Sequence, residues 1–301
     1  MQDQIRLPDK RRLSILFLAT FFPICGLGDE QAIHRLIING DEALVIQQLE
    51  ESPELVSQMG ENSMLPIHYA VSYSSLRVIR VLIHQGSDVN AKCYNGFTPL
   101  HLCVQEEAAR FLIEKGADAT LVDSLGSNPL QRAVFDGRTS IANALLESGI
   151  PMDLLSAIAL GKVQDARQLA IEDPIKVKDE NYFGPVLPSA LMAAARFGSL
   201  ELSELFVKLG ANPNQYRPFE MGFGGGCSPL TEAALGLHHD VAKFLIDNGA
   251  NPFVKVGIYG NSLLSLVPKS DEGREIRDLL SSEWEGLSTE QKVLTEKKFV
   301  W

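Results

Sequence analysis

Between residues 95 and 118 the chain reads NGFTPLHLCVQEEAARFLIEKGAD, which predicts two short helices that end in a glycine. Thr98 and Pro99 form a helix start, because a threonine hydroxyl can cap open backbone N–H groups and proline is preset for the first helical turn. Gly116 permits the left-handed conformation that often ends a helix. Such a helix pair cannot bury its apolar side alone, so neighbouring pairs must stack against it.

The same pattern recurs with a period of about 33 residues, which is typical of a repeat architecture. Clear copies start with LGSNPLQRA at residues 125–133 and CSPLTEAA at residues 227–234. The residue at the histidine position precedes the helix-terminating residue by 18 positions in four copies: His68 and Gly86, Gln131 and Gly149, Met192 and Gly210, Thr231 and Gly249.

Two degenerate copies keep this spacing, from His34 to Ser52 and from Leu155 to Asp173. A proline follows each of these two pairs and supplies the helix stop that glycine supplies elsewhere. We therefore expect about seven units between residues 29 and 251. A looser eighth unit, from Asn261 to about Leu280, is expected to cap the stack.

These motifs resemble the ankyrin repeat, with its T-P-L-H start and its L-L-x-x-G-A-x-x-N end. The resemblance implies an all-α ankyrin-repeat solenoid of stacked helix-turn-helix units with β-hairpin-like fingers, over residues 29–281. Residues 282–301 would form a C-terminal tail or capping helix. The motif histidines would hydrogen-bond neighbouring units. The structural motif positions are His68, Thr98, Pro99, Leu100, His101, Pro129, Leu130, Ser228, Pro229 and Leu230, with Gly86, Gly116, Gly149, Gly210 and Gly249 at the helix ends.

Some units depart from the pattern. Only 15 positions separate His101 from Gly116, which predicts a trimmed connection between the two helices of that unit. The unit that begins at Asp153 lacks the T-P-L-H start. Two fingers are expanded, at residues 176–188 and 215–226, and long insertions in repeat proteins map to loops that often form the binding face.

The first 28 residues differ from the rest and are typical of a signal peptide. Four cations, Arg6, Lys10, Arg11 and Arg12, precede an apolar stretch from Leu13 to Ile24, and small residues follow before Asp29. We therefore expect an exported, periplasmic or secreted protein that meets the membrane only transiently. The alternatives are an uncleaved membrane anchor, for which the stretch is short, and a buried N-terminal helix in a cytoplasmic protein.

Charge and cysteine content exclude several classes of protein. The net charge of −11 argues against nucleic-acid binding, which needs clustered Lys and Arg. Beyond residue 28 the cysteines are Cys93, Cys103 and Cys227, an odd number that cannot pair completely within one chain. No C-x-x-C motif occurs, so neither a disulfide scaffold nor a metal site is expected.

No residue pattern indicates catalysis. His238, His239 and Asp240 fall at the start of a second helix, where the repeat commonly has a histidine and an acidic residue, so a structural role is favoured over metal binding. The glycine run at residues 222–226 lacks the Lys-Ser/Thr of a phosphate loop. We expect no enzyme activity, no cofactor and no small-molecule substrate.

Aromatic residues recur in the fingers and are the candidate anchors for a protein partner. The candidate partner-binding residues are Tyr94, Phe97, Tyr182, Phe183, Tyr216, Arg217, Phe219, Phe223 and Tyr259. Residues 216–223 are the hypothetical principal patch, although several of these rings could instead pack under their own loop. The sequence thus predicts a monomeric scaffold, adaptor or inhibitor. An exported bacterial effector that acts on a host protein, and an accessory subunit of an enzyme, are the alternatives.

Overall fold

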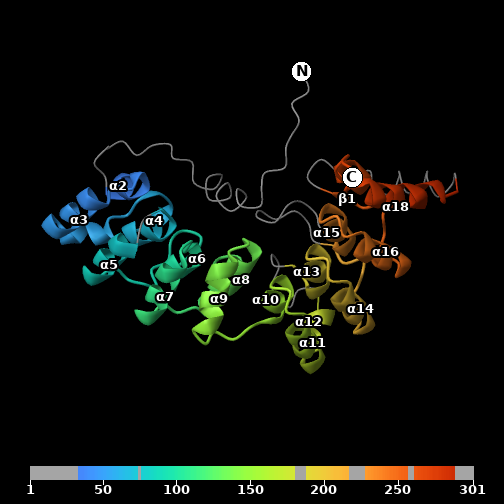
Figure 1. Cartoon of the computed structure of the whole chain (residues 1–301), viewed down its shortest axis with the longest axis horizontal. Helices are drawn as coiled ribbons and strands as arrows, with labels where there is room; N and C mark the ends of the chain where they lie inside the picture. Colours follow the sequence, from blue (N-terminus) through green and yellow to red (C-terminus); the bar gives the residue numbers. More distant parts are fainter. Residues whose placement is uncertain (1–32, 74–75, 180–187, 217–227, 257–260, 289–301) are drawn as a thin grey trace, which may run out of the picture. The chain divides into compact units, whose positions relative to one another are not determined.

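A computed structural model describes residues 33–73, 76–179, 188–216, 228–256 and 261–288 (Figure 1). The chain divides into two compact units, Met1–Pro151 and Met152–Trp301, where the sequence predicted one repeat domain over 29–281. The linking residues 148–153, between the last helix of one unit and the first helix of the next, are too few for a finger of the usual length.

The first unit consists of helix pairs in two parallel rows (Figure 1). The inner helices α2, α4, α6 and α8 pack in order, as do the outer helices α3, α5, α7 and α9. The elements are α2 (Ile33–Asn39), α3 (Glu42–Glu51), η1 (Pro53–Ser57), η2 (Glu61–Ser63), α4 (Pro66–Tyr73), α5 (Leu76–His84), α6 (Pro99–Leu102), α7 (Glu106–Glu114), α8 (Pro129–Phe135) and α9 (Thr139–Glu147).

The second unit repeats this arrangement. Its inner row is α10, α13, α15 and α17, and its outer row is α11, α14, α16 and α18. The elements are α10 (Leu154–Ala159), α11 (Val163–Glu172), α12 (Ile175–Lys178), α13 (Ala190–Arg196), α14 (Leu200–Lys208), α15 (Pro229–Leu235), α16 (His239–Asp247), β1 (Lys255–Val256), β2 (Asn261–Ser262), α17 (Leu263–Leu266) and α18 (Arg274–Glu285).

Helix α18 covers the end of the second unit. It packs on α16 and α17 and runs through the division expected between residues 281 and 282. Trp284, near its end, contacts the ring of Phe253 edge-on, with the ring centroids 5.6 Å apart. The two short strands β1 and β2 pair antiparallel, as the predicted hairpin-like fingers require. The predicted all-α solenoid architecture is confirmed within each unit.

Six of the inner helices, α6, α8, α10, α13, α15 and α17, begin at side-chain caps, which explains why they start where they do. The Asn128 side chain accepts a hydrogen bond from the Gln131 N–H at 2.9 Å, while the Gln131 side chain accepts from the Asn128 N–H at 3.1 Å. Such a reciprocal capping box satisfies two open donors at once. Asp153 accepts from the Ser156 N–H at 3.0 Å, so the unit without a T-P-L-H start is capped by an aspartate.

The short unit is short in its first helix, not in its connection. Helix α6 ends at Leu102, so it lacks the last turn that α8 has, while residues 103–105 and 136–138 connect the helices of the two units equally. The prediction of a trimmed connection was therefore wrong. Removing about one helical turn, near 3.6 residues, leaves the chain pointing in a similar direction at the helix end, whereas a shortened connection could not reverse the chain.

Candidate protein-interaction surface

Three loops of the first unit project from the helix pairs, and a histidine anchors each. We call them the first finger (residues 52–65), the second finger (85–98) and the third finger (115–128). An Nε2 atom on the preceding inner helix lies 2.9–3.0 Å from a finger carbonyl in each case: His34 and Gln58, His68 and Ala91, His101 and Ser127. His68 and His101, two of the predicted motif histidines, each bond to the finger that leads to the next unit.

Burial keeps these histidines neutral. It lowers the pKa of His34, His68 and His101, and that of His101 falls to about 4. The neutral ring suits its two contacts, because His101 Nδ1 accepts the Thr98 N–H at 3.2 Å while Nε2 donates to Ser127. Both ring nitrogens of the buried His101 are therefore hydrogen-bonded, and neither is free for proton transfer.

An asparagine bridge also joins successive fingers, and sequence reasoning missed it. Asn90 Nδ2 donates to the Gly116 carbonyl at 3.2 Å, and Asn90 Oδ1 accepts the Asp118 N–H at 2.8 Å. In the second unit Asn214 makes the same pair of bonds to Gly249 and Asn251, at 2.6 and 2.8 Å. The available signal was an asparagine four positions after the terminal glycine in both copies.

Backbone hydrogen bonds hold the finger tips together. The Tyr94 N–H donates to the Asn62 carbonyl at 2.8 Å, and the Ser124 N–H donates to the Asn95 carbonyl at 2.9 Å. Within the second finger, the Cys93 N–H donates to the Phe97 carbonyl at 3.1 Å. The three fingers are therefore tied to one another at their tips, and the Asn90 bridge also joins the second and third at their bases.

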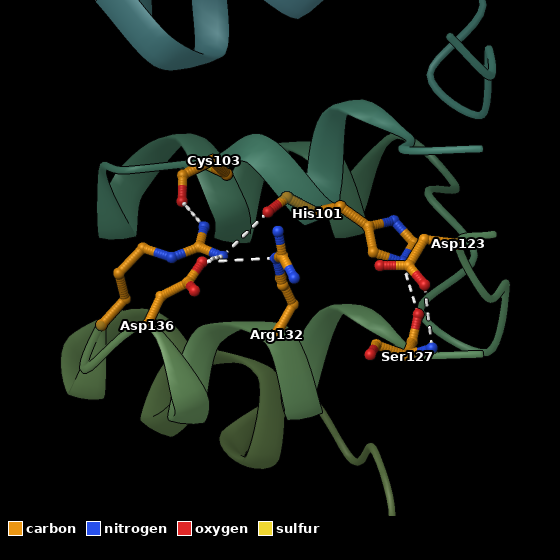
Figure 2. Close-up of polar contacts among 7 residues, drawn as sticks. His101, Cys103, Asp123, Ser127, Arg132 and Asp136 are labelled. Carbon is orange, nitrogen blue, oxygen red and sulfur yellow. Dashed lines mark hydrogen bonds and ion pairs between the residues drawn. The ribbon is translucent and has the colours of Figure 1, made fainter. Parts of the chain in front are cut away.

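Arg138 replaces the contacts that the shortened helix α6 would otherwise make. Its guanidinium donates to the Cys103 carbonyl at 2.6 Å and to the His101 carbonyl at 2.9 Å, and it pairs with Asp136 at 3.0 Å (Figure 2). The last carbonyls of a helix lack partners within the helix, so these bonds cap α6. In the second unit the equivalent residue, His238, contacts the Arg196 carbonyl of a full-length helix at 3.0 Å.

The remaining side chains of this cluster fix the base of the third finger. Asp123 Oδ1 accepts the Ser127 N–H at 2.9 Å (Figure 2) and also the Leu125 N–H at 2.8 Å. Burial raises the pKa of Asp123. Arg132 lies within 3.5 Å of Asp136 and stacks over the ring of Phe97, with its guanidinium carbon 5.0 Å from the centroid.

Phe97 is not an exposed anchor, which corrects one predicted partner-binding residue. Its side chain is only 7% exposed, lies between the His101 ring and the Arg132 guanidinium, and packs under its own finger. A cation over an aromatic face is stabilising, more so when desolvated, so this arrangement orders the finger. At this position the aromatic ring therefore packs under its own loop instead of facing a partner.

Two predicted anchors are exposed. Tyr94 is 78% exposed and Tyr216 is 51% exposed. Six others, Tyr182, Phe183, Arg217, Phe219, Phe223 and Tyr259, lie outside the described residues, as does Cys227. Met59, at 68% exposed, and Val122, at 47%, are exposed finger residues that the aromatic criterion overlooked.

The described residues offer little for chemistry. Among them, no three His, Cys, Asp or Glu side chains form a group that could hold a metal ion. Cys93 and Cys103 are buried free thiols, and burial raises the pKa of Cys103 to about 11, which disfavours the reactive thiolate. No helix in the described ranges is both long and apolar enough to span a membrane.

Known proteins share this repeat. A 219-residue region is 24% identical to "Probable 26S proteasome regulatory subunit p28" of Saccharomyces cerevisiae and covers 71% of this chain and 83% of that protein. A 253-residue region is 24% identical to E3 ubiquitin-protein ligase KEG of Arabidopsis thaliana; it covers 75% of this chain but spans only 15% of the ligase. The crystal structure of the human ASB11 ankyrin repeat domain is 25% identical, with a TM-score of 0.39, over 71% of this chain and 96% of that chain.

A family model decides the membership. The model for ankyrin repeats matches in three copies, over residues 24–123, 93–156 and 154–256, which together exceed half of the chain. The matched regions contain the motif histidines and the helix-terminating glycines described above. The chain belongs to the ankyrin-repeat family.

Proposed function

We propose that this chain is a non-catalytic module that binds another protein through its finger tips and its inner-helix face, as a scaffold, adaptor or inhibitor. Ankyrin repeats generally mediate protein–protein interaction, which supports a protein as the ligand. The side chains that meet in the described residues form hydrogen bonds that hold neighbouring units together. This supports a binding role over an enzymatic one.

The observation that carries the proposal is the exposed ring of Tyr94 on a fixed backbone. The ring is 78% exposed, while the N–H of the same residue is bonded to Asn62 at 2.8 Å. Interfaces draw most of their energy from a few anchors, with tyrosine among the enriched types. Because the finger is already ordered, a partner that covers this ring would not bear the entropy cost of ordering the loop.

A photo-cross-linking amino acid at position 94 tests this proposal in an extract of the native organism. The matched control places the same group at Glu107, an exposed position on the outer helix α7. We expect a discrete cross-linked protein from position 94 and none from position 107. Equal labelling from both positions, or none from either, would contradict binding through the fingers.

Tyr216 marks the second proposed anchor region, the patch at residues 216–223. Its 51% exposure supports the proposal for that residue alone. Replacing Tyr216 and Phe219 by alanine is expected to weaken partner capture while thermal unfolding stays unchanged. Unchanged capture by the folded variant would remove this patch from the binding surface.

A role as a subunit of a larger assembly is a second candidate. It is supported by the match to the yeast protein named as a proteasome regulatory subunit, because that match covers most of both chains. Size-exclusion chromatography of a fresh extract distinguishes this candidate. A stable subunit elutes wholly in a large complex, whereas a transient adaptor elutes partly as a monomer.

We also propose that residues 1–28 direct export, on the strength of their basic and apolar pattern. An intact mass of the native protein that begins at Asp29 is the expected result. A mass that retains Met1 would favour a cytoplasmic or anchored protein, and would weaken the alternative of an exported effector that acts on a host protein.

A further inference from the structure

The tips of the first and second fingers form one exposed surface. We call residues 58–62 together with Tyr94 the finger-tip surface. The side chains of Met59 and Tyr94 are 68% and 78% exposed, the two highest values among the large apolar side chains described. The hydrogen bond from the Tyr94 N–H to the Asn62 carbonyl, at 2.8 Å, joins the two tips.

The backbone of the first tip is tightly constrained. Asn62 and Ser63 both have positive φ, at 54° and 57°, a region that costs a residue other than glycine roughly 1–2 kcal/mol. The loop closes through the Gly60 N–H on the Met64 carbonyl at 2.8 Å. A Cβ at Gly60 would approach the Tyr69 hydroxyl to 2.9 Å, so the loop packs closely on helix α4. Met59 is therefore presented by a rigid support.

The segment that carries the first tip is acidic and lies between Arg35 and Arg77. From Leu36 to Leu76 the chain contains six acidic residues, Asp41, Glu42, Glu50, Glu51, Glu54 and Glu61, and neither lysine nor arginine. Within the described ranges, none of the six belongs to an ion pair. Further along the unit, by contrast, Glu106 and Glu147 both pair with Arg110, at 2.9 and 2.5 Å.

The cation nearest to Tyr94 in the sequence contacts the third finger. Lys92 is two positions from Tyr94, but its Nζ lies 3.5 Å from the Val122 carbonyl of the third finger. The ammonium group is thus directed to the side of the second finger away from the first. Glu61 belongs to the finger-tip surface and Glu54 to the same finger, and neither forms an ion pair within the described ranges.

We propose that the finger-tip surface binds a basic segment of a partner protein, one that places an apolar side chain against Met59 and Tyr94 and its Lys or Arg residues near Glu54 and Glu61. This inference rests on the proposed function and adds the chemistry of the partner. Complementary charge speeds encounter and rejects wrong partners, while apolar anchors supply the affinity. An acidic second copy of this chain, or an anionic membrane, would be repelled.

The probe is an array of synthetic twelve-residue peptides whose net charge runs from −4 to +4, each made with and without a central Leu-Trp pair. The full chain is expected to bind the basic peptides that carry the apolar pair, and to bind them more weakly as salt increases. Equal binding to acidic peptides, or binding that is insensitive to salt, would overturn the proposal.

Matched charge variants locate the site. Glu54→Gln with Glu61→Gln is expected to weaken binding of the basic apolar peptides roughly fivefold at low salt, since exposed ion pairs are individually weak. Glu107→Gln with Glu114→Gln removes the same charge from helix α7 and should leave binding unchanged. Met59→Ala with Tyr94→Ala should abolish the preference for the apolar pair. An equal loss of peptide binding in both glutamine variants would show that only the net charge of the chain matters. That result would overturn the site.

The position-94 cross-link separates this inference from the proposed function. A partner could cross-link at position 94 and yet bind the Glu54→Gln, Glu61→Gln variant as tightly as the wild type. In that case the proposed function stands and the proposal of a basic partner is overturned. No cross-link at all counts against both. The chain's own segment at residues 1–28 is also basic and apolar, so a cross-link within the chain to that segment would overturn the assignment to a partner.

Discussion

At the scale of single residues, buried histidines and glycines carry the contacts between units. His101 caps its own helix and fastens the next finger, whereas Gln131 in the following unit makes the same cap. His101→Gln is therefore expected to keep the cap and lose the bond to Ser127. The cost should be about 1–2 kcal/mol, because a buried carbonyl loses its donor. Urea unfolding at pH 7 measures this difference.

Lowering the pH should remove part of the stability that His101 contributes to the fold. Its pKa is about 4 in the folded chain and 6.5 when exposed, so the unfolded state binds more protons between these values. The free energy of unfolding must then fall as pH decreases from 6.5 towards 4, by at most about 3 kcal/mol from this group. The difference between wild type and His101→Gln should shrink over that range. A difference independent of pH would show that folding does not lower the pKa of His101.

Two glycines of equal geometry provide a matched test of contacts between units. Gly198 and Gly137 have φ of 72° and 71° in equivalent connections. A Cβ at Gly198 would collide with the ring of His238, whereas a Cβ at Gly137 would meet nothing within 4 Å. Gly137→Ala should cost about 1 kcal/mol from left-handed strain alone, and Gly198→Ala clearly more. Equal losses in thermal unfolding would mean that the His238 contact is unimportant.

At the scale of elements, the missing turn of α6 and the arginine at position 138 form a compensated pair. Arg138→His should cost about 2 kcal/mol, because imidazole is too short to reach both the His101 and Cys103 carbonyls. Inserting Ala-Ala-Arg after Cys103 restores the turn but should crowd Arg138. The two changes together should be less harmful than the sum of their separate effects in a double-mutant cycle. Strict additivity would show that the arginine does not compensate for the deletion.

At the scale of the whole molecule, contacts in a repeat protein are mainly between nearest neighbours, so the two compact units need not unfold together. Both tryptophans, Trp284 and Trp301, fall in the second unit, and their fluorescence reports on it alone. His101→Gln should lower the unfolding midpoint seen by hydrogen exchange in α6 and α8 without shifting the tryptophan transition. A common shift of both signals would indicate one cooperative block.

The helix pairs, their caps and their family could be predicted from the sequence, because those features depend on neighbours along the chain. Thr98, Asn128 and Ser228 act within three residues, and the terminal glycines act within one helix end. The asparagine bridges also left a periodic trace, in Asn90 and Asn214, that becomes meaningful once their partners are known.

Tertiary structure decided what depends on neighbours in space. Phe97 and Tyr94 are both finger aromatics, but only Phe97 meets the cation and ring of adjacent helices, which bury it. The three missing residues could have been lost from a helix or from a connection. The shorter helix is stable because Arg138 donates to the His101 and Cys103 carbonyls at its end. Local patterns specify which residues can form a unit, whereas the fate of each side chain depends on the unit stacked against it.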